Sequence, residues 1–223
     1  MASPRRTSAE LAFTTLGLLL MAVQPAQAAA DPRSTRETQG ALSPEARKMI
    51  AWILESKDNG GLPFVIVDKV DARVLVFDPK GGLKGASPAL LGSARGDDST
   101  PGIGERKLSA IQPQERTTPA GRFVASLGRN LGKDDILWVD YEAAISLHRV
   151  VRGGPNDRRL ERLATASPLD NRISYGCINV PVIFYETVVR PAFTGTDGIV
   201  YVLPESRPIG AVFPGYGRAT QAP

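Results

Sequence analysis

The 223-residue sequence has one cysteine, Cys177, and one histidine, His148. A single cysteine cannot form an internal disulfide, so this one is buried and inert, paired with another chain, or a reactive thiol. One cysteine and one histidine also supply too few soft ligands for a zinc centre, and we expect neither a metal nor a cofactor. The same two side chains, a thiol and an imidazole, are the minimum set of groups that acyl transfer by a cysteine nucleophile requires.

Long hydrophobic runs are missing beyond the first residues of the sequence. Two arginines precede an apolar run over residues 11–23, which is short for a bilayer span, and triplets of small residues follow it. We interpret residues 1–30 as a secretory signal peptide, with an uncleaved anchor as the alternative. The mature protein is then expected in the periplasm or cell envelope, with no stable membrane insertion. Exported proteins usually carry cysteines in pairs, which makes a single one more informative.

Strong charge of either sign is also missing. The formal net charge is +4, and it becomes +3 without the expected signal peptide. This mild basicity suits an ordinary soluble surface, and also an anionic polymer such as a cell-wall glycopeptide. It is too weak and dispersed to indicate a nucleic-acid partner.

The sequence is rich in turn-forming residues, with 22 glycines and 18 prolines, which favours a β-rich fold over a helix bundle. Two β-branched runs joined by a short turn predict a hairpin over residues 64–78. A helix is expected to begin at Ser43-Pro44, and another to cover residues 181–189 and end before Pro191. Further strands are expected at residues 87–91, 122–127, 136–141, 144–151 and 198–203.

There is no internal repeat and no obvious linker, so we expect one main domain. After the signal peptide, residues 31–60 form an extension with one helix, residues 61–204 the catalytic domain, and residues 205–223 an irregular tail. Residues 153–171 form a polar insertion between His148 and Cys177, which could act as a lid.

Cys177 follows a short extended segment and precedes a helix that we expect to begin near residues 179–181. A helix N-terminus favours a thiolate, because its unpaired N–H groups and its dipole stabilise negative charge. The amides of Gly176 and Cys177 could form an oxyanion hole, and His148 could accept the thiol proton. A buried, inert cysteine with an unrelated histidine is the alternative that the residues leave open.

The order of the site residues resembles the signature of the L,D-transpeptidase (YkuD-type) catalytic domain. Members of this family are exported enzymes that cross-link bacterial peptidoglycan. The matching residues are His148, Ser174, Gly176, Cys177, Ile178 and Asn179, with a Thr-Pro-x-Gly-x-Phe element at residues 118–123. The resemblance covers roughly residues 64–203. It implies a mainly β fold: an L,D-transpeptidase-like β-sandwich or open barrel of mixed sheets with a few short helices.

The resemblance also implies an activity. Cys177 would form a thioester with a peptidoglycan stem tetrapeptide and pass it to an amine, with His148 as general base and acid. This would cross-link or remodel the wall, with consequences for cell shape, and carbapenem-type inhibitors would be further ligands. In support of the site we expect Ser174, Tyr175 and Asn179, and as partners of substrate carboxylates Arg149 and Arg172.

Two features depart from the family pattern. Tyr175 stands where the family has a second histidine, and it cannot carry a positive charge at neutral pH. The insertion at residues 153–171 lengthens the distance from His148 to the cysteine motif. Two other functions therefore stay open: a carboxypeptidase or amidase that uses water as acceptor, and a catalytically silent peptidoglycan-binding protein.

Overall fold

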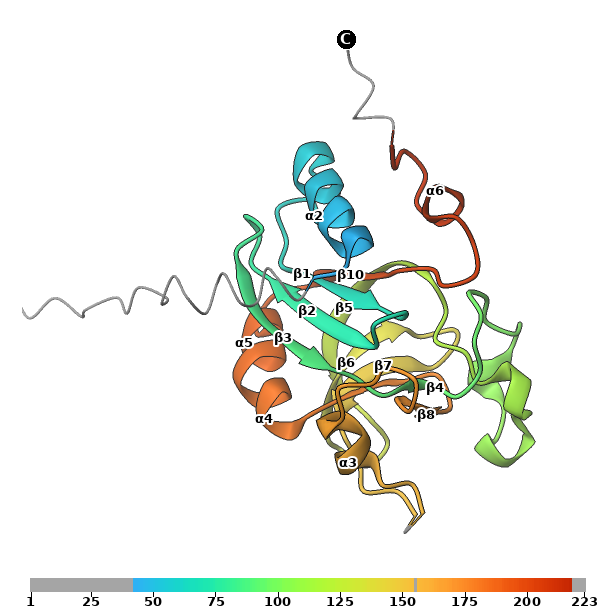
Figure 1. The fold of residues 1–223 in the computed structure, drawn as a ribbon. Helices are drawn as coiled ribbons and strands as arrows, with labels where there is room; N and C mark the ends of the chain where they lie inside the picture. Colours follow the sequence, from blue (N-terminus) through green and yellow to red (C-terminus); the bar gives the residue numbers. More distant parts are fainter. Residues whose placement is uncertain (1–41, 155, 218–223) are drawn as a thin grey trace, which may run out of the picture.

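The computed structural model describes residues 42–154 and 156–217, so the expected signal peptide lies outside the described residues. As expected, the protein is mainly β, with one large mixed sheet and a few short helices (Figure 1). The strands are β1 (Phe64–Asp68), β2 (Arg73–Phe77), β3 (Leu83–Pro88), β4 (Leu91–Gly92), β5 (Gly121–Arg129), β6 (Asp135–Asp140), β7 (Ile145–Arg149), β8 (Arg172–Ser174), β9 (Ile178–Val180) and β10 (Gly198–Val202).

The helices are short apart from the first. They are α2 (Pro44–Ser56), α3 (Arg159–Ala164), α4 (Val182–Phe184), a π-helical turn η4 (Tyr185–Val189), α5 (Arg190–Phe193) and α6 (Ile209–Val212). Three 3₁₀ turns, η1 (Ile103–Glu105), η2 (Leu108–Ala110) and η3 (Pro113–Glu115), punctuate the long loop between β4 and β5. Within the described residues, no helix combines the length and the apolar character needed to cross a membrane.

The large sheet has the strand order β3-β2-β1-β10-β5-β6-β7-β9. Strand β5 joins its two halves, because residues 121–125 pair with β10 and residues 126–129 pair with β6. The pairs β1–β10 and β7–β9 are parallel, and the other pairs in this sheet are antiparallel. Strands β4 and β8 form a separate parallel pair beside β9.

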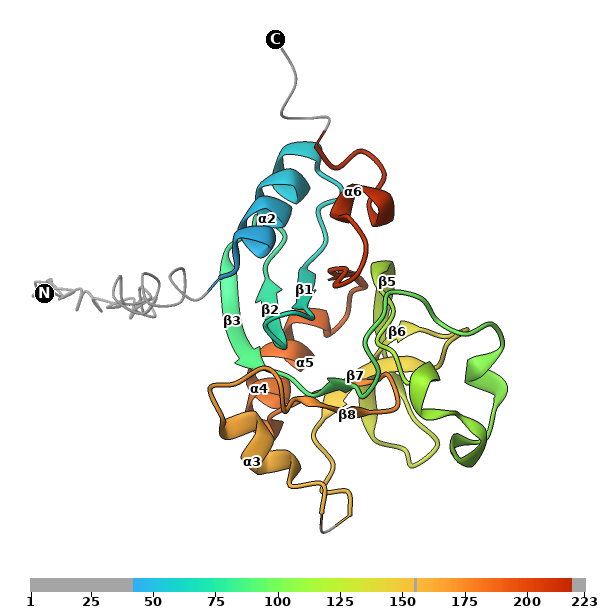
Figure 2. The same cartoon turned by 45° about the vertical axis from the view of Figure 1, so that its right-hand side comes forward.

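Helix α2 covers one face of the first half of the sheet (Figure 2). Neighbouring residues determine where the helix begins. The Ser43 hydroxyl caps it by accepting a hydrogen bond from the Ala46 amide at 3.0 Å, and Pro44 occupies the first turn. Met49 and Ile53 are fully buried in the same cluster as Phe64 and Phe77, whose rings stack at 4.8 Å. The tail over residues 205–223 was expected to be irregular, but its described part contains the short helix α6, and Phe213 belongs to this cluster.

The helical segment after β9 covers the other core. It runs from Val182 through Phe193, so the expectation that it ends before Pro191 is wrong. The π-helical turn changes the hydrogen-bond register, and Pro191 then falls in the first turn of α5, where a missing N–H is tolerated. Tyr185, Val189 and Phe193 recur every four residues and are all buried, which favours a continuous helical segment.

The strand expected at residues 87–91 lies elsewhere. Strand β3 ends at Pro88, and β4 covers only Leu91 and Gly92. The β3 sequence has weak intrinsic strand preference, and its pairing with β2 at the edge of the sheet decides its conformation.

Candidate active site

The parallel pairing of β7 with β9 brings the cysteine and the histidine together. Its register sets Leu147 opposite Ile178 and His148 opposite Asn179. Cys177 directly precedes β9, so its side chain lies beside the middle of β7. The structure therefore unites two groups that the insertion separates in sequence.

The sulfur of Cys177 lies against backbone and hydroxyl groups of the β6–β7 region. It is 3.6 Å from the Ser146 hydroxyl and 3.7 Å from the Ala144 carbonyl oxygen. The thiol is free and half-buried. Ser146 itself is buried, and sequence reasoning missed it because only the fold places it opposite the thiol.

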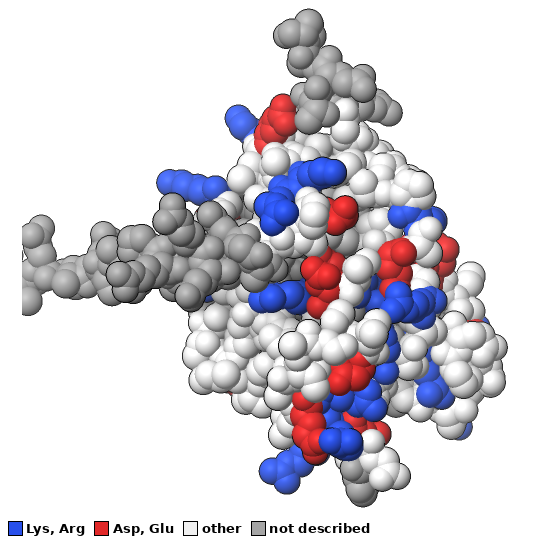
Figure 3. Space-filling view, viewed as in Figure 1, with Lys and Arg blue, Asp and Glu red and all other residues white. Residues whose placement is uncertain are grey.

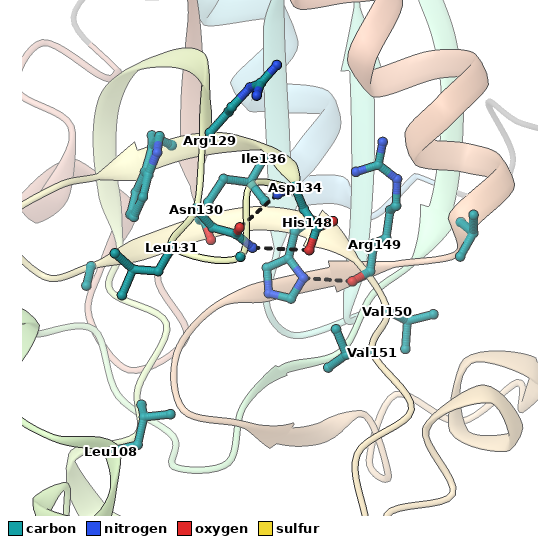
Figure 4. A pocket seen from close by; sticks show the side chains of 15 residues that line it. Leu108, Arg129, Asn130, Leu131, Asp134, Ile136, His148, Arg149, Val150 and Val151 are labelled. Atoms are coloured by element: carbon teal, nitrogen blue, oxygen red, sulfur yellow. Dashed lines mark hydrogen bonds between the residues drawn. The ribbon is translucent and has the colours of Figure 1, made fainter.

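The His148 ring is oriented by its own strand. Its Nδ1 lies 2.7 Å from the Arg149 carbonyl oxygen, as Figure 4 shows. A carbonyl oxygen only accepts hydrogen bonds, so Nδ1 carries the proton. The other ring nitrogen, Nε2, is then the basic one and can take a proton from a thiol.

The two groups change each other's proton affinity. Burial is the largest influence on Cys177 and would raise its pKa, but His148 and the Ser146 hydroxyl and amide outweigh it and the pKa of the thiol is lowered. Burial would lower the pKa of His148, yet the neighbouring Cys177 and the Arg149 carbonyl raise it overall. The two directions together favour a thiolate–imidazolium pair.

A helix N-terminus does not contribute to this thiolate, which corrects the sequence expectation. Cys177 is followed by β9, and the helix begins only at Val182. Ile178 and Val180 are fully buried, and pairing with β7 makes this segment a strand. His148 and Ser146 supply the stabilisation that the sequence assigns to a helix N-terminus.

The loop before Cys177 is held by a set of short hydrogen bonds. The Ser174 hydroxyl donates to the Cys177 carbonyl at 2.6 Å and accepts from the Gly176 amide at 3.1 Å. The side-chain amide of Asn179 donates to the same carbonyl at 3.2 Å. The Gly176 amide, predicted as an oxyanion-hole donor, is thus engaged by Ser174 within the loop.

Gly176 is required at its position for a steric reason. Its φ of +133° lies in a region that L side chains rarely adopt. A Cβ there would come within 2.7 Å of both the Ile145 Cδ1 atom and the Thr117 carbonyl oxygen. The loop therefore packs against the sheet as only glycine allows.

Thr118 is a support residue whose role sequence reasoning missed. Its fully buried hydroxyl donates to the Gly176 carbonyl at 2.8 Å and accepts from the Gly92 amide at 2.9 Å. The Thr-Pro-x-Gly element was the available signal, but its target lies far away in the sequence. Thr118 thus links β4 to the loop over residues 174–177, which we call the cysteine loop.

Tyr175 is exposed and stacks with an arginine. The guanidinium carbon of Arg116 lies 4.1 Å from the centre of the Tyr175 ring, in cation–π geometry. The cation of Arg116 therefore lies over the Tyr175 ring.

The two arginines expected to bind substrate carboxylates are paired with carboxylates of the protein. Arg149 contacts Asp135 and Glu186 at 2.9 and 2.6 Å, respectively, and stacks on the Tyr185 ring. Arg172 contacts Glu205 at 2.6 Å in a buried network away from the thiol. Both guanidiniums are thus engaged by internal carboxylates, and Arg149 also lines the cleft beside the site.

A cleft of about 750 Å³ opens beside the site, and Ala144, Ser146 and His148 form part of its wall. Most of its other wall is apolar, with Leu108, Leu131, Ile136, Val150 and Val151 among the lining residues (Figure 4). On the face in Figure 3, basic and acidic side chains are interspersed. Within residues 42–154 and 156–217, no cluster of histidine, cysteine and carboxylate groups could hold a metal ion.

Comparisons with known proteins give structural likenesses alone. No family model matches the chain, and no curated protein matches it in sequence. The helical cell shape determining protein Pgp2 from Campylobacter jejuni is similar in structure, with a TM-score of 0.45 and 14% identity over 66% of this chain and 49% of that one.

Two L,D-transpeptidase structures are also similar. An L,D-transpeptidase from Mycobacterium tuberculosis H37Rv has a TM-score of 0.40 and 17% identity over 63% of this chain and 57% of that one. L,D-transpeptidase 3 from Mycobacterium tuberculosis, in complex with a faropenem-derived adduct, has a TM-score of 0.38 and 15% identity over 64% and 60%. The chain thus spans about half to three fifths of the length of these proteins. At these scores and identities, function must be argued from the residues of the chain itself.

Proposed function

We propose that this protein is an exported, L,D-transpeptidase-like acyltransferase that acts on peptidoglycan stem peptides through Cys177. The observation that carries the proposal is the thiol–imidazole pair. It joins a thiol of lowered pKa to a histidine whose Nδ1 is fixed by a carbonyl, which leaves Nε2 to exchange protons.

The pair can perform both halves of an acyl transfer. The Cys177 thiolate attacks the carbonyl carbon that follows the L-centre of the diamino acid, and the amide of Cys177 stabilises the oxyanion. As the C–N bond breaks, the His148 imidazolium gives its proton to the departing D-alanine amine. An acceptor amine then attacks the thioester, His148 takes a proton from its nitrogen, and the C–S bond breaks to restore the thiolate.

A carbapenem provides the first test, because its strained ring acylates an activated thiol without any acceptor. Intact-protein mass spectrometry should show one adduct on the wild-type protein and none on Cys177→Ser. A stem tetrapeptide, incubated with and without an added amine, then identifies the acceptor. Transfer to the amine supports a transpeptidase, and release of a free tripeptide alone indicates a carboxypeptidase.

A silent peptidoglycan-binding protein is the second candidate, and Tyr175 favours it because this residue replaces a histidine of the family pattern. It predicts muropeptide binding with no product and no adduct, and binding unchanged in Cys177→Ala. A folded wild-type protein that gives neither a carbapenem adduct nor a processed peptide would overturn the enzyme proposal.

A further inference from the structure

The insertion at residues 153–171 contacts β9 beside the site through the Arg159 side chain, at the start of α3. This side chain is 12% exposed, and its Nε lies 3.0 Å from Asp157 Oδ2. Its Nη1 donates to the Asn179 side-chain oxygen at 3.1 Å. The guanidinium therefore joins the insertion to β9.

Asn179 connects this contact to the cysteine loop. The side chain is buried, it accepts from Arg159, and its Nδ2 donates to the Cys177 carbonyl at 3.2 Å. A guanidinium can only donate, so it fixes which end of the Asn179 amide faces the loop. Asn179 is also the register partner of His148 in the β7–β9 pair.

The base of the insertion is built around the Asp157–Arg159 pair. Gly153 has a φ of +66°, and a Cβ there would overlap the Asp157 carboxylate and lie 2.7 Å from Arg159 Nε. Arg162 donates to the carbonyl oxygens of Asp157 at 2.7 Å and of Asp170 at 2.5 Å. These contacts within the insertion fix the position of the Arg159 side chain.

We propose that Arg159 is a positioning residue of the site: through Asn179 it holds the Cys177 backbone in place beside His148. The inference rests on the proposed function for its catalytic meaning. The contacts themselves can be tested whether or not that function is correct.

The charge of Arg159 acts on the same pair. Burial has the largest effect on the pKa of His148 and lowers it, Cys177 raises it, and Arg159 lowers it. The Arg149 carbonyl oxygen lies 2.7 Å from His148 Nδ1, and the charged residues Arg129, Asp134 and Arg149 line the same cleft as the ring. Arg159 thus opposes the effect of the thiolate, which eases proton release from the imidazolium to a leaving group.

Three variants separate the position of this side chain from its charge. Arg159→Gln removes both the charge and the fork of donors, whereas Arg159→Lys keeps the charge and loses the fork. Arg158→Gln is the matched control, because Arg158 is the preceding residue, is 68% exposed, and pairs only with Glu161 among the described side chains.

Two measurements need no substrate. His148 is the only histidine in the sequence, so its ring signals in an NMR titration are unambiguous. We expect the titration midpoint to rise in Arg159→Gln and to stay near wild type in Arg159→Lys and Arg158→Gln. Amide hydrogen exchange across residues 174–179 should accelerate in both Arg159 variants and not in the control.

The third measurement is the rate of carbapenem acylation. It should fall about tenfold or more in both Arg159 variants, because small displacements of a nucleophile reduce rates strongly. The inference is overturned if Arg159→Gln matches Arg158→Gln in titration midpoint and in exchange. If Arg159→Gln does not fold, exchange in Arg159→Lys decides, and wild-type protection there overturns the inference. If the wild-type protein forms no carbapenem adduct while the Arg159 variants show the expected changes in titration midpoint and amide exchange, the proposed function alone is refuted.

Discussion

His148 and Cys177 form a pair in which each group sets the protonation of the other. The sulfur sits among Ser146, Ala144 and the imidazole, and burial by itself would keep it protonated. Its reactivity therefore depends on His148, the largest of the opposing influences, and on Ser146. The sequence contains no other histidine to replace His148.

The first prediction concerns removal of His148. In His148→Gln, burial would act without the opposing imidazolium, so the pKa of Cys177 should rise. The midpoint of iodoacetamide alkylation should move to higher pH, and the alkylation rate at neutral pH should fall about tenfold or more. Mass spectrometry of the single thiol follows the reaction. An unchanged pH profile would show that His148 does not activate the thiol.

At the scale of elements, the loop that carries Cys177 lies where β4, β8, β9 and the segment before β5 meet. Thr118 makes the central connection, because one hydroxyl serves the Gly92 amide and the Gly176 carbonyl. Both partners belong to segments distant in sequence. The loop is thus held by side chains that lie outside the cysteine motif as well as by Ser174 and Asn179 within it.

The second prediction tests this connection. Thr118→Val keeps the shape but leaves two buried backbone groups without a partner, so the free energy of unfolding should fall by about 2–4 kcal/mol. Thr118→Ser retains the hydroxyl and should lose much less. Urea denaturation measures both variants. Equal stability of the valine and serine variants would contradict the assigned role.

At the scale of the whole molecule, a buried charge network ties distant segments together. Lys69 in the β1–β2 turn contacts Asp97 at 2.7 Å and Glu205 at 3.7 Å, and Glu205 also binds Arg172. Asp97 accepts further hydrogen bonds from the backbone of residues 205–207. The network joins the turn, the long loop after β4, strand β8 and the segment after β10.

The third prediction is acid sensitivity from Asp97. Burial opposes ionisation of this carboxyl, but Lys69, the Ser206 hydroxyl and backbone amides outweigh it and hold the pKa of Asp97 well below its usual range. A lowered folded-state pKa contributes stability above the unfolded value of about 3.9, and this contribution is lost as pH falls toward the folded-state value. Stability should therefore fall steeply below about pH 4.

Asp97→Asn should lower the free energy of unfolding at neutral pH by about 3–5 kcal/mol, because it leaves the buried Lys69 without its main partner. The difference from wild type should narrow on acidification. Asp98→Asn is the matched control, since Asp98 is 79% exposed, and it should change stability by about 0.5 kcal/mol or less. Chemical denaturation at several pH values checks both variants, and a constant difference across pH would exclude Asp97 as the source.

The sequence by itself determined the features that depend on neighbouring residues. Ser43-Pro44 set the start of α2, and β-branched runs set the β1–β2 hairpin. The single cysteine and single histidine, with the surrounding motif, indicated the candidate nucleophile and base. These signals are local, because capping, turn geometry and strand preference act over a few residues.

Only the tertiary structure decided what those residues contact. It made residues 178–180 a strand, because β7 pairs with them, and so replaced the expected helix dipole by His148 and Ser146. It paired Arg149 and Arg172 with internal carboxylates, and it brought Thr118 and Arg159 to the cysteine loop. Such contacts join residues far apart in the chain, and only the folded core determines which of them meet.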